Sequence, residues 1–272
     1  MREGTEAVEF LACSQARVDI LMSLRQHGDM TEHELRERLD YARTTVTRNL
    51  NALHEQDWIR VSDGRYAITT CGELIVEQFI NLTETTATTT QLQPFLQWVP
   101  RDNLDFDVTL LQDAELTVAE PGNPLKMVHR HVQQLKETTD LRAVVPLTGL
   151  HPYEVQHRRM LQEQLEAEHV VSPNVAETFQ SDPDFVDLTR DMLNSGWFDV
   201  YVYDSNIPYY LGILDDTIQI GADEAGTPRA LIETTSDEVR AWAEETYRDY
   251  KEAARPLEEK MTSADDVAEQ RV

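Results

Sequence analysis

The residues Arg43-Thr44-Thr45-Val46-Thr47-Arg48-Asn49-Leu50-Asn51-Ala52-Leu53 decide the fold of the N-terminal part of this chain. Val46, Leu50 and Leu53 recur at helical spacing and predict the buried side of a helix from about Arg43 to Gln56. The opposite side would display short hydroxyls, an amide and guanidinium groups: Arg43, Thr44, Thr45, Thr47, Arg48 and Asn51. Such side chains suit base edges and phosphates in a DNA major groove.

Two further helices are expected before this segment. Ser14 to His27 carries an apolar stripe and ends near Gly28. Thr31-Glu32-His33-Glu34 has the pattern of a capping box, in which the first and last side chains satisfy each other's backbone N–H groups. It predicts the start of a second helix, separated from the third by the short break at residues 40–42.

A hairpin and a fourth helix are expected after it. Residues 58–69 alternate in polarity about Asp63-Gly64, a preferred dipeptide for a two-residue hairpin turn. Thr70-Cys71-Gly72-Glu73 resembles a second capping box and predicts a helix to about Leu82. The order helix, helix, helix, hairpin, helix predicts a winged helix-turn-helix domain over residues 1–82, with Arg60 and Arg65 on the wing.

The run from Arg43 to Leu53 resembles the recognition helices of many microbial winged-helix regulators, and this resemblance implies binding to double-stranded DNA. Those helices commonly have Ser or Thr where this chain has Ala42, so Asp40 is the candidate capping residue. The alternative is an interaction scaffold whose winged helix contacts protein.

The charge of the chain opposes DNA binding except in one window. The chain has 50 acidic and 24 basic residues, a net charge of −26, and only four lysines. Residues 41–70 carry a net charge of +1, whereas residues 83–272 carry −21. The acidic, lysine-poor composition resembles proteins of salt-loving archaea, in which molar salt screens such charges over about 3 Å. DNA contact is therefore least opposed where the third helix and the wing are expected.

Beyond the first domain we expect a linker over 83–105, which can be partly helical, an α/β domain over 106–257 and a polar tail over 258–272. The threonine-rich stretch 83–90 has no apolar period and suggests the linker. Strands are predicted at 106–111, 116–119, 141–147, 170–171, 197–203, 209–214, 217–222 and 229–234, and helices at 124–136, 152–168, 182–194 and 236–255. The expected fold class is thus α+β or α/β.

The second domain contains the segments Leu141-Arg142-Ala143-Val144-Val145-Pro146, Phe198-Asp199-Val200-Tyr201-Val202-Tyr203 and Pro208-Tyr209-Tyr210-Leu211-Gly212-Ile213-Leu214-Asp215-Asp216. With Ile220-Gly221-Ala222 and residues 241–247, they make the chain similar to archaeal regulators that join a winged helix to a methanogenesis-regulator middle domain, a group abundant in haloarchaea. The resemblance implies a transcription regulator with a ligand-sensing domain. The residues that we expect to bind the ligand, with a cation and phenol hydroxyls at the ends of the strands, are Arg142, Tyr203, Tyr209 and Tyr210.

The same stretch distantly resembles half of a phospholipase D-type fold, whose catalytic His and Lys would fall on Pro208 and Tyr210. We therefore expect no enzyme activity, no cofactor and no metal site. His129 and His131 diverge on a helix, and the pair Asp215-Asp216 is interpreted as a solvated turn. The two cysteines, Cys13 and Cys71, are expected to be buried.

The sequence as a whole predicts a cytoplasmic, ligand-controlled, DNA-binding homodimer, because one winged helix covers half of a symmetric site. The interface candidates are the helix 236–255 and residues 92–98. No apolar run is long enough for a membrane span. A DNA-tethered hydrolase with an unrecognised site is the alternative from another class.

Overall fold

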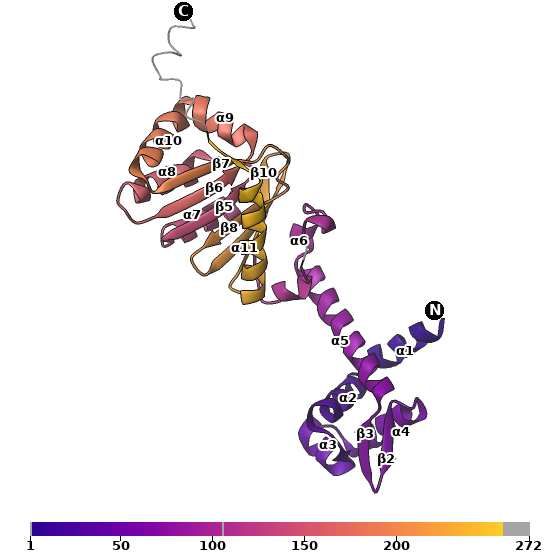
Figure 1. Cartoon of the computed structure of the whole chain (residues 1–272). Helices are drawn as coiled ribbons and strands as arrows, with labels where there is room; N and C mark the ends of the chain where they lie inside the picture. Colours follow the sequence, from indigo (N-terminus) through magenta and orange to yellow (C-terminus); the bar gives the residue numbers. More distant parts are fainter. Residues whose placement is uncertain (1, 105, 258–272) are drawn as a thin grey trace, which may run out of the picture. The chain divides into compact units, whose positions relative to one another are not determined.

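The structure is a computed structural model that describes residues 2–104 and 106–257 (Figure 1). The chain divides into two compact units, Met1–Thr86 and Ala87–Val272. The predicted polar tail, 258–272, lies outside the described residues. Among those described, no helix is both long and apolar enough to cross a membrane.

The first unit follows the element order predicted for it. Its helices are α1 (Arg2–Ala12), α2 (Gln15–His27), α3 (Glu32–Leu39), α4 (Arg43–Glu55) and the first part of α5 (Thr70–Gln91). Its three-stranded antiparallel sheet has the order β1 (Met30–Thr31), β3 (Arg65–Ile68), β2 (Ile59–Ser62). Only α1 and the short strand β1 were not expected.

Local side-chain bonds explain where these elements begin and turn. Thr31 Oγ1 accepts from the Glu34 N–H at 3.2 Å, and Glu34 Oε2 accepts from the Thr31 N–H at 2.6 Å, which confirms the first capping box. Asp63 and Gly64 have φ values of 52° and 76°, as the predicted hairpin turn requires. The second capping box is wrong: Thr69, not Thr70, accepts from the Gly72 N–H at 3.1 Å.

The apolar side of α4 packs into the core of the first unit. Leu21 of α2, Leu35 of α3 and Leu50 of α4 are fully buried. Trp58 joins them just before the hairpin and meets the ring of Phe10 edge-on, with ring centroids 5.3 Å apart. This core fixes which side of α4 faces outward.

The segment expected to be a linker differs in the structure. Helix α5 continues through the threonine-rich stretch to Gln91, and threonine hydroxyls there donate to carbonyls of the same helix: Thr83 Oγ1 to Ile80 O at 2.8 Å and Thr86 Oγ1 to Leu82 O at 2.7 Å. Beyond it, Leu92 and Phe95 are fully buried in the core of the second unit. Residues 92–104 are thus part of that core, and the apolar side chains of 92–98 proposed for an interface are used within the chain.

The second unit is built on an eight-stranded mixed sheet. In spatial order its strands are β11 (Arg255–Pro256), β7 (Phe198–Val202), β6 (Glu166–Val171), β5 (Asp140–Val145), β8 (Tyr210–Leu214), β9 (Thr217–Glu224), β10 (Thr227–Thr234) and β4 (Glu115–Val118). β5, β6 and β7 pair in parallel, and the other neighbours pair antiparallel. This confirms a fold with helices and a large mixed sheet.

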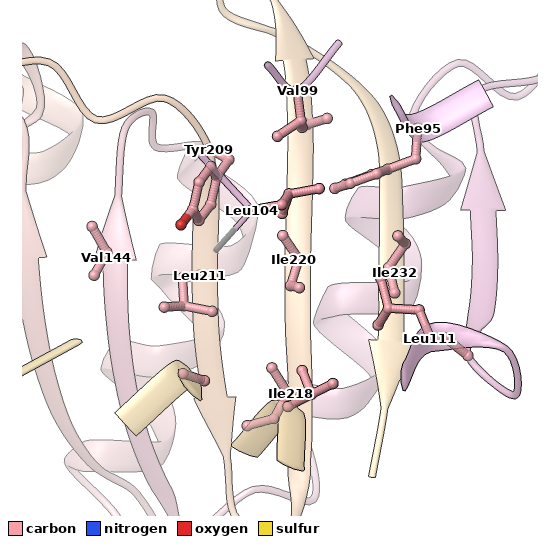
Figure 2. Packing of buried hydrophobic residues seen from close by; sticks show 14 of the residues in the cluster. Phe95, Val99, Leu104, Leu111, Val144, Tyr209, Leu211, Ile218, Ile220 and Ile232 are labelled. Atoms are coloured by element: carbon pink, nitrogen blue, oxygen red, sulfur yellow. The ribbon is translucent and has the colours of Figure 1, made fainter. Parts of the chain in front are cut away.

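Helices cover both faces of this sheet. One face packs against α7 (Lys126–Leu135), α8 (Leu150–Met160), α9 (Pro173–Ser181) and α10 (Pro183–Ser195). The other packs against α11 (Asp237–Glu252), α6 (Gln93–Leu96) and the 3-10 turn η2 (Val108–Leu111); Val99 and Leu104, on either side of a further 3-10 turn, η1 (Arg101–Asn103), also join this core. Figure 2 shows this second core, with Phe95 and Leu104 over the strand that carries Ile220.

Several predicted elements of the second unit are wrong. Residues 106–111 do not form a strand: 108–111 form η2, which begins where the Asp107 carboxylate accepts from the Thr109 N–H at 2.9 Å and closes a turn. The helix expected to reach residue 168 ends at Met160, since the chain turns at Glu163, whose φ is 55°. Helix α9, capped by Ser172, was missed.

In the first unit both cysteines, Cys13 and Cys71, are exposed and not buried as expected.

Candidate functional site

Helix α4 presents the polar surface that the sequence suggested. Val46, Asn49, Leu50 and Leu53 form its buried side. Arg43, Thr44, Arg48 and Asn51 are exposed, while Thr45 and Thr47 are partly buried. A shallow depression on this side is lined by Arg43, Thr44, Thr47, Arg48, Asn51, Ala52 and Glu55. Five of the six predicted residues of this helix therefore line one depression, and Thr45 does not.

The start of α4 has no side-chain cap. Ala42 occupies the N-cap position, and its carbonyl accepts from the Thr45 and Val46 N–H groups at 2.9 and 3.1 Å. Asp40 does not substitute, because it is the left-handed C-cap of α3, with φ 51°. The first N–H groups of α4 are thus without a capping carboxylate, which favours an anion there.

Two arginines of the predicted surface are already paired with carboxylates of α3. Arg43 Nε lies 3.4 Å from Glu32 Oε1, which also accepts from the Thr47 hydroxyl at 3.0 Å. Arg65 Nη2 lies 3.5 Å from Glu34 Oε2 and also bonds to the Asp29 carbonyl. These contacts hold both guanidinium groups next to α4 and the hairpin, but they partly neutralise them.

The other two arginines differ. Arg48 on α4 and Arg60 on β2 are exposed, and neither has an ion pair with any described residue. Arg60 pairs in register with Ala67, and Arg65 with Ser62 at the turn, so both wing arginines lie on the hairpin. Arg48 and Arg60 are the cations of this surface that are free to meet a phosphate or a base.

The four residues predicted to bind a ligand do not form one site. Arg142 of β5 lies 3.6 Å from Asp140 and 3.4 Å from Glu244 of α11. Tyr203 packs edge-on against Tyr250, and Tyr209 is buried in the core under α11. Tyr210 points to the opposite face of the sheet. The structure therefore separates Tyr210 from the other three.

Tyr210 instead lines a cavity of about 390 Å³ on the face covered by α7 and α8. The walls are mainly apolar, and the loop 146–151 and the β9–β10 hairpin contribute to them. Tyr210 is joined there by His131, Gln156 and His169. Sequence reasoning set His131 aside and missed His169. A histidine directly before the predicted strand Val170-Val171 was the available signal.

A chain of hydrogen bonds leads to this cavity from a charged pair. Arg130 Nε donates to Glu233 Oε2, and Glu233 Oε1 accepts from Gln219 Nε2 at 2.9 Å. Gln219 Oε1 lies 2.6 Å from His131 Nδ1. Because Gln219 uses its amide N–H toward Glu233, its oxygen faces His131 and requires the proton on Nδ1. Neutral His131 then has an acceptor nitrogen at Nε2.

Burial keeps the polar groups of the cavity uncharged. It lowers the pKa of His131, and with His131 nearby it lowers the pKa of His169 to about 3. Burial likewise raises the pKa of the Tyr210 phenol, with a further contribution from Glu233. At neutral pH the cavity therefore offers neutral imidazoles and a neutral phenol.

The pair Asp215-Asp216 has a structural role. The Asp215 carboxylate accepts from the Thr139 and Asp140 N–H groups, each at 3.0 Å, and from the Thr139 hydroxyl at 2.8 Å. Asp215 is thus more than the solvated turn expected, whereas the Asp216 side chain is fully exposed. No cluster of three potential metal ligands occurs within residues 2–104 and 106–257.

Two family models match this chain, one in each part. Residues 124–253 match the model described as "Methanogenesis regulatory protein FilR1, middle domain". This part of the chain is therefore similar to the middle domain of a regulatory protein. Residues 5–91 match a model described as the HVO_A0261 N-terminal domain. The first match confirms the predicted resemblance to the methanogenesis-regulator middle domain. No curated protein matches the chain.

The solved structures that match this chain do so at low similarity. TrmBL2, described as an archaeal chromatin protein with a novel mode of DNA binding, is 11% identical with a TM-score of 0.42, covering 92% of this chain and 98% of its own. Nuc from Salmonella typhimurium, a phospholipase D family member, is 14% identical with a TM-score of 0.41, covering 53% of this chain and 97% of its own. NucT from Helicobacter pylori is 12% identical with a TM-score of 0.38, and covers 53% and 98%.

Proposed function

We propose that this protein is a DNA-binding transcription regulator whose first unit is a winged helix-turn-helix. The observation that carries the proposal is the outward side of α4, where exposed Arg48 and Asn51 have no partner among the described residues. In such domains the second helix of the motif enters the major groove, and Arg and Asn read guanine and adenine through paired hydrogen bonds.

The wing supports the same function. Arg60 and Arg65 lie on a short hairpin closed by Asp63-Gly64, a geometry suited to the DNA backbone beside a bound helix. Arg43 and Thr44 at the start of α4 would contact phosphates, where uncapped N–H groups also favour an anion. Two copies bound to a symmetric site would double these contacts, so we expect a homodimer.

We further propose that the second unit binds a small effector and performs no catalysis. The positions that a phospholipase D-type site would need for His and Lys are Pro208 and Tyr210. Pro208 has no nucleophilic side-chain atom, and Tyr210 cannot supply the positive charge of a lysine. Tyr210 borders the cavity beside α7 and α8, which suits binding rather than phosphodiester cleavage.

The test is a gel-shift assay in which the protein is mixed with genomic DNA fragments. A fragment that the protein binds is then used to compare the affinities of protein variants. Arg48→Ala should weaken specific binding by about 1–3 kcal/mol if it reads a base pair. Arg65→Ala should weaken specific and non-specific DNA alike. Arg158→Ala, an exposed arginine of α8 with the same charge change, is the matched control.

Unchanged affinity in folded Arg48→Ala and Arg65→Ala proteins would overturn the proposed surface. A wild-type protein that retains no fragment at any salt concentration would favour the interaction scaffold instead. Reproducible phosphodiester hydrolysis that is lost on substitution of an acidic residue or histidine in the second unit would favour the tethered hydrolase.

A further inference from the structure

The cavity beside α7 and α8 holds buried polar atoms that the protein does not satisfy. Both ring nitrogens of His169, the Tyr210 hydroxyl and Gln156 Oε1 are buried without a hydrogen-bond partner. His169 and Gln156 are only 3% and 5% exposed. Leaving one such group unpaired costs roughly 1–3 kcal/mol. Three side chains with unpaired polar atoms in one cavity therefore indicate a missing hydrogen-bond partner.

We propose that this cavity binds an uncharged, mainly apolar small molecule through one polar end that can both donate and accept a hydrogen bond. The proposal deepens the effector role of the second unit and rests on it. The molecule would be the effector itself or another uncharged, mainly apolar molecule with the same kind of polar end.

The polar atoms determine the chemistry of that end. Gln156 Oε1 is an acceptor, and neutral His169 offers one donor and one acceptor. His131 adds an acceptor at Nε2, because Gln219 holds the proton on Nδ1. The Tyr210 hydroxyl can act either way. A hydroxyl or amide group matches this mixed set, whereas a purely apolar molecule would leave all of these atoms unpaired.

The charges around the cavity argue against an ionic ligand. No Lys or Arg is among its lining residues, and the only carboxylate among them is Asp223, which is partly exposed and accepts from the Gly226 N–H at 2.8 Å. An anion would thus meet no Lys or Arg inside and a carboxylate at the hairpin; His151, which also lines the cavity, is exposed and lies 3.9 Å from Glu154. A cation would enter an apolar space with no buried carboxylate, at a large desolvation cost.

The size of the cavity limits the ligand. Engineered protein cavities of about 150 Å³ hold benzene. A cavity of about 390 Å³ therefore has room for a molecule of two or three rings, or an aliphatic molecule of similar volume. Two glycines leave room for the Tyr210 side chain in its wall: a Cβ on Gly212 or Gly221 would come within 2.3 Å or 3.1 Å of that side chain.

The experiment is calorimetric titration of the full chain, without DNA, with three probes that share one ring system: 2-naphthol, naphthalene and 2-naphthoate. We expect 2-naphthol to bind most tightly, because it alone combines the apolar body with an uncharged donor and acceptor. Tyr210→Phe should weaken 2-naphthol about fivefold to tenfold and leave naphthalene unchanged. Tyr203→Phe, a tyrosine outside the cavity, is the matched control and should change neither.

A measurement on the unchanged chain guards against misfolding of the variant. Addition of 2-naphthol should shift the ring NMR signals of His131 and His169, while the exposed His33 and His54 stay unchanged. Equal affinity for naphthalene and 2-naphthol, tighter binding of 2-naphthoate, or no saturable binding of any probe would overturn the proposal. Since no DNA is present, these outcomes are independent of the gel-shift results that decide DNA binding.

Discussion

The phenol oxygen of Tyr210 occupies the space in which a side chain on Gly212 would begin. A Cβ on Gly212 would lie 2.3 Å from that oxygen and 2.8 Å from Leu214 Cδ1. Leu214 and the Tyr210 hydroxyl are both buried on the face covered by α7 to α10, so neither can move without displacing others.

Gly212→Ala should therefore destabilise the second unit by about 1–3 kcal/mol, the usual range for overpacking a core. The loss, measured by urea unfolding, should be smaller in a Tyr210→Phe background, because the closest atom is then gone. Strictly additive effects of the two substitutions would show that Tyr210 does not occupy this space.

Glu32 should limit DNA affinity. Its carboxylate lies 3.4 Å from Arg43 and would stand close to the phosphates contacted by α4. Glu32→Gln removes the charge, frees Arg43 and keeps an acceptor for the Thr47 hydroxyl, so affinity should rise roughly twofold to fivefold. Glu37→Gln, an exposed position on α3 paired with His33 at 3.5 Å, is the control. A loss of affinity in Glu32→Gln would mean that its contacts position α4 rather than oppose DNA.

Salt should affect DNA binding less than in an ordinary regulator. Phosphate contacts release counterions and give a slope of about −0.9 per contact, and only Arg43, Arg48, Arg60 and Arg65 are available here. Salt also screens the repulsion from the net charge of −21 on residues 83–272. We predict a shallow or positive dependence of affinity on potassium chloride up to molar concentrations, with folding followed by circular dichroism. A steep negative slope in a folded protein would contradict the charge argument.

Acid should destabilise the second unit through His169. Burial lowers its pKa to about 3 in the folded chain, so between that value and about 6.5 the unfolded chain binds the extra proton. Stability is therefore complete above the unfolded pKa and is lost as pH falls, by roughly 2 kcal/mol between pH 7 and pH 5. His169→Leu should remove much of this dependence in urea titrations, whereas His33→Gln, at an exposed position, should not. Identical pH profiles for wild type and His169→Leu would refute the neutral, buried histidine.

Asp215 should matter for stability and Asp216 should not. Asp215 has a φ of 49° and its carboxylate caps the start of β5, so Asp215→Ala should cost about 1–3 kcal/mol. Asp216→Ala removes only an exposed pair with Arg240 at 3.6 Å and should change the unfolding free energy by less than about 0.5 kcal/mol. Equal effects of the two substitutions would contradict the structural role of Asp215.

The parts of the fold that the sequence predicted correctly have strong local signals. The period of Val46, Leu50 and Leu53 identifies α4 and its outward side, and Asp63-Gly64 identifies the hairpin. The linker was predicted because residues 83–90 have no apolar period, and it was allowed to be partly helical; the structure extends α5 through these residues to Gln91.

The cavity could not have been found in this way. His131, His169 and Tyr210 come from α7, β6 and β8, and only the pairing of distant strands brings them together. Strand alternation does place Tyr209 and Tyr210, adjacent in sequence, on opposite faces of the sheet, so assigning both to one site was an avoidable error. It could not show which distant residues lie beside each of them.

The strand order also has a consequence for synthesis on the ribosome. β5 pairs with β8 through Ala143 and Gly212, and β4 pairs with β10 through Leu116 and Ile232. Both early strands thus lack a pairing partner until the last part of the chain has been synthesised. Until then, β4 and one edge of β5 expose unpaired backbone groups, which invite association with other chains. Translation that stops after β7 would therefore release a chain in which β8, β9 and β10, the strands between β5 and β4, are missing. Such fragments should aggregate rather than persist as partly active regulators.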